Sequence, residues 1–159
     1  MMKKNLAGLA MMAVIAVASL PAFSDTGNGC AVEAYTDGTV GVAYYQQNYE
    51  LGINGGYSNQ SPDDSVTSIN GWAGLRRAMT STLFMGLGVN LGTSTGTTSG
   101  SKLAGILTTG VYTSLELAVA PNVLVQGVWS LGATVAGTTG SDQSRSISSS
   151  GTMCFSYLF

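Results

Sequence analysis

Three charged residues offer the most specific pairing in this sequence. Glu50, Arg76 and Glu116 each lie on the more polar side of a segment in which apolar and polar residues alternate. A hairpin centred on Asp63 would bring Glu50 opposite Arg76, with Glu116 at a similar height on another strand. Buried charges that lack a partner are very costly. We therefore interpret the three as a structural ion-pair cluster, with a selectivity constriction in a small pore as the alternative.

Catalytic chemistry has little support in the sequence. The chain contains no histidine, so no serine can be activated by an imidazole, and histidine or clustered thiolate ligands for zinc are missing as well. Lys102, the only lysine beyond residue 24, falls at the edge of an expected loop. A Ser-Lys pair or a carboxyl dyad stays open in principle, but we expect no enzymatic activity, no metal site and no cofactor.

The elements that would position these residues are β-strands. From residue 25 onward, apolar and polar side chains alternate in segments that are separated by turn residues. Asp37-Gly38 is a strong signal for a two-residue hairpin turn. The expected strands are 30–36, 39–46, 49–58, 65–76, 82–93, 102–119, 123–136 and 146–159.

The strand count and the charge pattern indicate how the strands assemble. An even number of strands places both chain ends on one side, and short connections alternate with longer ones at 59–64, 94–101 and 138–145. Charged residues make up 9 % of the chain, against about 25 % in soluble domains. The three charges that we place within the second to eighth strands all lie on the polar face, and a charge facing lipid costs about 2–4 kcal/mol.

These observations predict an all-β fold over residues 25–159: a closed, eight-stranded, antiparallel, up-and-down transmembrane β-barrel. Its apolar face would point outward to lipid, and its small polar residues would fill the lumen. Trp72 and Tyr112 have the parity of lumen residues, whereas Trp129 has the parity of lipid-facing ones. The alternative is a soluble secreted β-barrel or β-sandwich with the apolar face inward.

Residues 1–24 have the pattern of a secretory signal peptide. Lys3 and Lys4 precede an apolar run over residues 6–20, and Ala22 and Ser24 are small residues at the spacing that a signal peptidase needs. The run is shorter than the roughly 20 residues that a membrane-spanning helix needs. Cleavage after Ser24 would leave four basic and eight acidic side chains. Without a basic patch, we expect no binding to nucleic acid.

The last strand ends in alternating aromatic residues, Phe155, Tyr157 and Phe159. With the signal peptide and the eight alternating segments, this ending resembles the small eight-stranded outer-membrane β-barrel proteins of bacteria, whose closing aromatic residue is read by the insertion machinery. The resemblance implies an outer-membrane location, contact with outer-membrane lipid, and a filled or very narrow lumen. It also weighs against catalysis, because the enzymes among outer-membrane barrels rely on histidine.

Cys30 and Cys154 are the only cysteines. An even count in an exported protein suggests a disulfide. The two residues lie on the first and last expected strands, which must pair if the barrel closes, so we expect a disulfide that joins them across the seam. The alternative is two unpaired thiols packed as small hydrophobic groups.

The predicted function is a non-enzymatic, monomeric barrel with a structural or surface-interaction role in the bacterial envelope. The alternative is a narrow, porin-like channel for small or apolar solutes. No motif in the sequence indicates a surface ligand.

Overall fold

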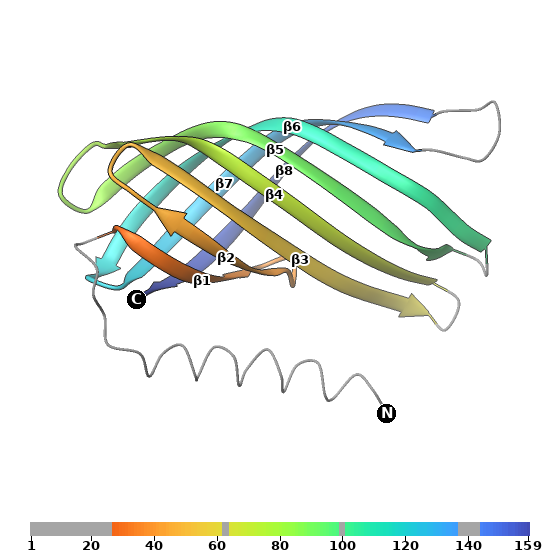
Figure 1. Ribbon diagram of the computed structural model, residues 1–159, viewed down its shortest axis with the longest axis horizontal. Coiled ribbons are helices and arrows are strands. Elements are labelled where there is room, and N and C mark those ends of the chain that lie inside the picture. Colours follow the sequence, from red (N-terminus) through yellow and green to blue (C-terminus); the bar gives the residue numbers. More distant parts are fainter. Residues whose placement is uncertain (1–26, 62–63, 99–100, 137–143) are drawn as a thin grey trace.

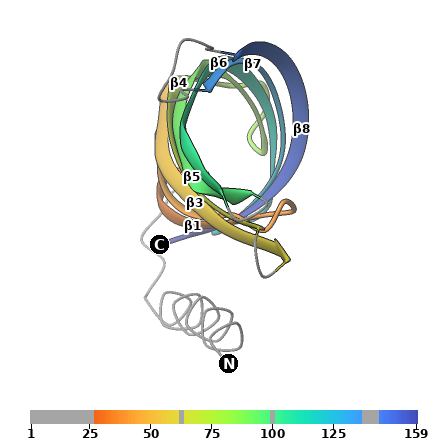
Figure 2. The same cartoon turned by 90° about the vertical axis from the view of Figure 1, so that its right-hand side faces the viewer.

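The computed structural model describes residues 27–61, 64–98, 101–136 and 144–159. Within them, eight antiparallel strands pair in sequence order and close into a barrel (Figures 1 and 2), because the last strand pairs with the first. The strands are β1 (Gly29–Tyr35), β2 (Val40–Tyr45), β3 (Tyr49–Ser61), β4 (Asp64–Ala78), β5 (Leu83–Thr98), β6 (Ser101–Ala120), β7 (Val123–Ala136) and β8 (Ser144–Leu158). The predicted closed eight-stranded barrel is confirmed. The expected signal peptide, residues 1–24, lies outside the described residues.

The first hairpin is short but fully integrated into the barrel. Val32 of β1 lies between Val42 of β2 and Tyr157 of β8, so β1 is hydrogen-bonded on both sides. The predicted turn at Asp37-Gly38 is present, and Gly38 adopts a φ of 88°, which favours glycine. The Asp37 carboxylate accepts hydrogen bonds from the backbone N–H and the hydroxyl of Thr39, at 2.9 and 2.8 Å. These bonds fix the local turn.

We call the two ends of the barrel the turn end and the loop end. The turn end holds Gly27, the C-terminus and the connections 46–48, 79–82 and 121–122. The loop end holds the connection 36–39, the ends of β3, β5 and β7 and the starts of β4, β6 and β8. Two of the expected long loops, at 59–64 and 94–101, are mostly strand instead. Both faces of the strand are polar there, so the apolar alternation stops while the backbone pairing continues.

The two faces of the sheet differ sharply in composition. Among the described residues, 23 large apolar side chains are exposed, and all but Met79 lie on the outward face of the strands, with Leu75 at 74 % exposure and Leu87 at 63 %. The inward face buries charged side chains, including Glu33 and Glu116 at 0 % exposure. The expected polar interior and apolar exterior are therefore found. Arg77 and Arg145, which fall just outside the expected strands 65–76 and 146–159, are exposed residues near the ends of β4 and β8.

No helix in the described ranges is both long enough and apolar enough to cross a membrane.

Candidate functional site

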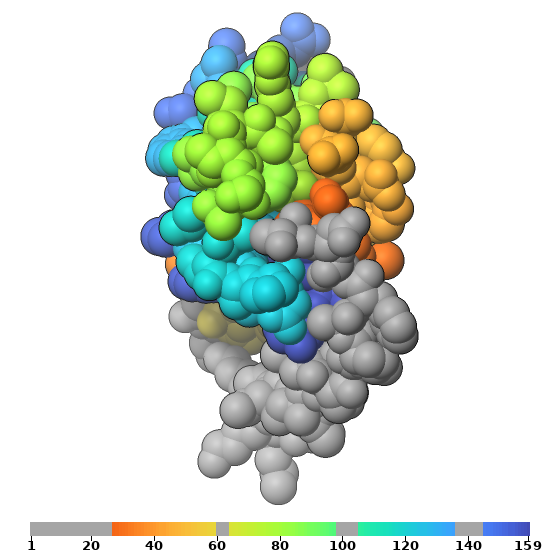
Figure 3. All heavy atoms as spheres, turned by 90° about the vertical axis from the view of Figure 1, so that its left-hand side faces the viewer, coloured from red at the N-terminus to blue at the C-terminus, as the bar shows by residue number. Residues whose placement is uncertain are grey.

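The lumen divides into two regions of different character. Towards the turn end, buried side chains meet and fill the lumen, and we call this region the plug. It comprises Glu33, Tyr45, Glu50, Arg76, Phe84, Tyr112, Ser114, Glu116, Leu124, Gln126, Ser156 and Leu158. Towards the loop end, the inward residues are small and leave a cavity of about 420 Å³, which we call the cup. Figure 2 looks into the ring of strands from the loop end, and Figure 3 shows the turn end in space-filling form.

An ion pair lies at the centre of the plug. The Nε of Arg76 donates a hydrogen bond to Glu116 at 2.8 Å, and both side chains are fully buried. The Nη1 of Arg76 also donates to the Oδ1 of Asn28 at 3.3 Å and to the carbonyl of Gln46 at 3.2 Å. The guanidinium carbon lies 3.8 Å from the centroid of the Phe84 ring, a cation–π distance. Arg76 thus contacts β5 through Phe84, β6 through Glu116, the β2–β3 turn through Gln46 and the residue just before β1, Asn28.

The predicted pairing of Glu50 with Arg76 is wrong in its register. Glu50 lies opposite Gly74, and Arg76 lies opposite Gly86 on the other side of β4. The β3–β4 turn is centred one residue earlier than Asp63, and a register irregularity lies between Asn59 and Ser61. Glu50, Arg76 and Glu116 do all face the plug, but Arg76 forms its ion pair with Glu116.

Glu50 on β3 instead accepts a hydrogen bond from a tyrosine on β6. The hydroxyl of Tyr112 donates to the Oε1 of Glu50 at 2.7 Å. The strand register places Gly74 and Gly88 between these two residues in one row around the barrel. A Cβ on Gly74 would collide with the Tyr112 hydroxyl, and a Cβ on Gly88 would lie 2.6 Å from its ring. The two glycines therefore make the space through which Tyr112 reaches Glu50.

Sequence reasoning missed a further buried carboxyl group, Glu33. It accepts hydrogen bonds from the hydroxyls of Tyr35 at 2.7 Å and Ser156 at 3.4 Å, and from the hydroxyl of Tyr45. The Nε2 of Gln126 donates to the same Tyr45 hydroxyl at 2.6 Å. Glu33 has the same parity as Tyr35 on β1, but the alternation of this short strand did not determine which of its faces points inward.

Apolar side chains fill the rest of the plug towards the turn end. Tyr45, Phe84, Leu124 and Leu158 are buried there in one cluster with three alanines. The start of the described chain crosses the same end, where a Cβ on Gly27 would lie 2.8 Å from the Phe84 ring. Gly27 has a φ of 75°, a further reason for glycine at this position.

The expected seam disulfide is wrong, because both cysteines are free. Cys30 is exposed at the start of β1, whereas Cys154 is buried inside the barrel. Cys154 pairs in register with Tyr35 at the far end of β1. The two thiols therefore lie at different heights along the barrel axis as well as on opposite faces of the wall. The expectation relied on a register for the first strand that the alternation did not determine.

The C-terminal aromatic residues lie at the turn end beside the seam. Phe155 is half exposed on the outward face. Tyr157 lies in register between Val32 of β1 and Val123 of β7. The backbone N–H of Phe159 donates a hydrogen bond to the carbonyl of Cys30 at 2.9 Å. Their role as an insertion signal stays a prediction.

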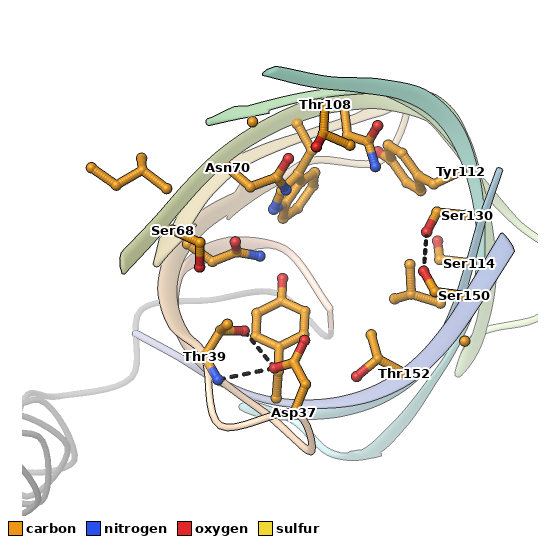
Figure 4. A pocket seen from close by; sticks show the side chains of 18 of the residues that line it. Asp37, Thr39, Ser68, Asn70, Thr108, Tyr112, Ser114, Ser130, Ser150 and Thr152 are labelled. Carbon is orange, nitrogen blue, oxygen red and sulfur yellow. Dashed lines mark hydrogen bonds between the residues drawn. The ribbon is translucent and has the colours of Figure 1, made fainter. Parts of the chain in front are cut away.

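The cup is lined mainly by hydroxyl and amide side chains. In Figure 4, Asn70, Thr108, Ser130, Ser150 and Thr152 point into it from four different strands. Ser130 and Ser150 bond to each other across β7 and β8 at 2.8 Å. Towards the plug the cup ends on aromatic rings, because Trp72 and Tyr112 pack edge to face with centroids 5.9 Å apart.

Two polar atoms beside the cup have no partner among the described residues. They are the Nε1 of Trp72 and the Oδ1 of Asn90, which belong to register partners on β4 and β5. A Cβ on Gly52 would lie 2.6 Å from the Trp72 indole, so glycine is what lets the ring lie against the wall. Among the residues that the structure describes, no group of three or more His, Cys, Asp or Glu side chains is arranged to hold a metal ion.

Comparison with known proteins finds no matching protein family, no similar curated protein and no similar solved structure.

Proposed function

We propose that this protein is a transmembrane β-barrel of the bacterial outer membrane that acts without catalysis, in the structure or the surface interactions of the envelope. The observation that carries this proposal is the placement of apolar and charged groups. The exposed apolar side chains include Leu75, Leu87 and Val89, each at 60 % exposure or more, while Glu33, Arg76 and Glu116 are buried inside. In water, such a belt would be a far larger apolar patch than the few hundred Å² of a typical soluble monomer.

The plug favours a non-conducting barrel over the narrow channel. A solute that crossed the lumen would have to displace the Arg76–Glu116 pair and the apolar cluster around Leu124. Separating a buried ion pair leaves uncompensated charges and costs several kcal/mol. The channel remains the second candidate, because hydrogen-bonded networks can rearrange.

Insertion and conduction can be tested on the same preparation. We expect chain 25–159, refolded into phospholipid vesicles, to float with the vesicles and to migrate differently on a gel before and after boiling. We expect no discrete ion currents across a planar bilayer. Recovery of a stable, detergent-free monomer would overturn the membrane assignment, and regular single-channel steps would overturn the non-conducting role.

A further inference from the structure

The wall of the cup is low on one side. β1 and β2 contain 7 and 6 residues, whereas β3 and β8 contain 13 and 15. β2 pairs with β3 only as far as Gly55, and the last backbone hydrogen bond from the hairpin to β8 among the described residues joins the Thr36 N–H to the Met153 carbonyl, at 2.9 Å. Beyond these points, no described strand lies between β3 and β8, which stand further out on either side (Figure 1).

This low side would lie within the membrane if the proposed function holds, and the inference rests on that function. Seven residues at the usual rise and tilt of about 40° cover about 18 Å, whereas the apolar band of outer-membrane barrels is about 25 Å tall. The tip of the β1–β2 hairpin would then end below the outer edge of the band. A group could enter the cup over this rim from the outer leaflet as well as from the aqueous side.

The rim itself is polar and belongs to the cup. Asp37 and Thr39 at the hairpin tip and Ser150 and Thr152 on β8 all line the cavity (Figure 4). The hydroxyls of Thr36 and Thr152 lie 3.2 Å apart at the foot of the opening. An acyl chain lodged here would displace water from these polar groups and leave their remaining hydrogen-bonding capacity unused, which is unfavourable. The rim therefore favours a polar group.

Charge narrows the class of ligand further. Among the residues that the structure describes, the cavity lining includes two carboxylates and no Lys or Arg side chain. Asp37 is occupied by Thr39, and Glu50 is occupied by Tyr112. A phosphate or carboxylate would find no cation in this described lining with which to pair. An uncharged ligand rich in hydroxyl groups matches a wall of hydroxyls and amides, since each of its groups can both donate and accept.

The unpartnered atoms point to the same chemistry. Trp72 and Asn90 both line the cavity, and the Nε1 of Trp72 and the Oδ1 of Asn90 are buried atoms that have no partner among the described residues. One hydroxyl group can serve both, because it accepts with a lone pair and donates with its hydrogen. The cavity of about 420 Å³ lies within the range of small-molecule sites, about 300–1,000 Å³.

We propose that the cup binds an uncharged polyhydroxyl group, such as a sugar ring, against Trp72 and Asn90. This chemistry has two sources, a free saccharide that enters from the aqueous side and the headgroup of a glycolipid that enters over the β1–β2 rim.

The chain provides its own reporter for this site. It has two tryptophans, and Trp129 is exposed on the outer face, so Trp129→Phe leaves Trp72 as the only indole. The folded variant, held in a zwitterionic detergent that contains no sugar, is titrated with maltose and separately with dodecyl maltoside. We expect a saturable change in Trp72 emission in at least one titration. A response to both shows that the sugar is sufficient, and a response to the maltoside alone assigns the ligand to the membrane.

Matched variants separate binding from general perturbation. In the same background, Asn90→Ala removes the unpartnered acceptor and is expected to weaken binding about tenfold, the effect of one lost hydrogen bond. Ser149→Ala alters an exposed residue of β8 outside the cavity lining and is expected to leave binding unchanged. Heat-modifiable migration checks that both variants fold.

Three results would overturn the inference. They are no change of emission with either ligand at millimolar concentration, an equal change with a zwitterionic amphiphile of the same chain length, and equal weakening in both variants. A barrel that floats with vesicles yet gives one of these results retains its proposed function and loses only the sugar site.

Discussion

The plug and the cup are built from the same strands and the same alternation, yet one is filled and the other hollow. In the plug, inward positions carry large side chains such as Arg76, Phe84 and Glu116, which meet across the lumen. In the cup, inward positions carry Ser, Thr and Asn, which do not span it. Both regions have polar inward residues, so it is the size of the inward side chains that determines where the lumen of this barrel is blocked.

The two regions also differ in how far their polar groups are satisfied, although the plug too keeps one buried atom without a partner among the described residues, the Nη2 of Arg76. The carboxyl groups of Glu33, Glu50 and Glu116 each accept at least one hydrogen bond from a neighbouring side chain. Beside the cup, the Nε1 of Trp72 and the Oδ1 of Asn90 have no partner in the part of the chain that the structure describes. A satisfied network stabilises the fold, whereas open donors and acceptors are available to a ligand. Substitutions in the plug should therefore affect stability, and those in the cup should affect binding.

The largest effect is expected from Arg76→Ala. It leaves the Glu116 carboxylate buried without its cation, which typically costs about 3–5 kcal/mol. Urea unfolding in vesicles, followed by tryptophan emission, measures the loss. The adjacent Arg77→Ala is the matched control, because Arg77 is exposed and should change the free energy of unfolding by less than about 0.5 kcal/mol. Equal effects of the two substitutions would show that the plug ion pair does not stabilise the barrel.

A smaller effect is expected from Gly74→Ala. The added methyl group collides with the Tyr112 hydroxyl and breaks its bond to Glu50, so we expect destabilisation by about 1–3 kcal/mol. Gly71→Ala on the same strand is the control, since its Cβ would meet nothing closer than 3.8 Å. The same unfolding measurement compares them. If both are neutral, Tyr112 does not need the space that glycine leaves.

In the cup, Ser130→Ala should change stability by no more than about 0.5 kcal/mol. It removes the bond to Ser150, but both hydroxyls lie beside the open cavity, where water can replace the partner. A loss as large as that of Gly74→Ala would contradict the distinction between a structural plug and a hydrated cup.

Reduction should have no effect at all, because the two thiols are free. We expect two labelled cysteines per denatured chain under non-reducing conditions, and protection of Cys154 in the folded barrel, where it is buried. Gel migration before and after reductant is the companion measurement. A mobility shift on reduction would restore the seam disulfide and require a different register for β1.

Local alternation predicted the parts of the structure that depend on local geometry. It gave eight strands and their order, and it placed Trp72, Tyr112 and Glu116 inside and Trp129 outside. This success has a simple cause, since the side chains of a strand change face at every residue. The short segment 30–36 also proved to be a strand, β1.

Register was the part that could not be predicted. Moving the centre of a hairpin by one residue moves every cross-strand partner by two, and the irregularity between Asn59 and Ser61 is not visible in the alternation. The assignment of Arg76 to Glu50 failed for that reason. The seam disulfide failed because facing on β1 was undetermined, and the same uncertainty concealed Glu33. The low rim depends on the shortness of β1 and β2 relative to β8 and to β3, which continues to Ser61 rather than ending at Ser58 as expected.

The central claim, that the apolar face meets acyl chains while the polar face encloses the lumen, can be tested with the two tryptophans. Trp72→Phe and Trp129→Phe each leave one indole, which is compared in vesicles of ordinary lipid and of lipid brominated along the acyl chains. We expect strong quenching of Trp129 emission by the brominated chains and little quenching of Trp72. Equal quenching of the two, or quenching of Trp72 alone, would contradict this orientation of the barrel wall.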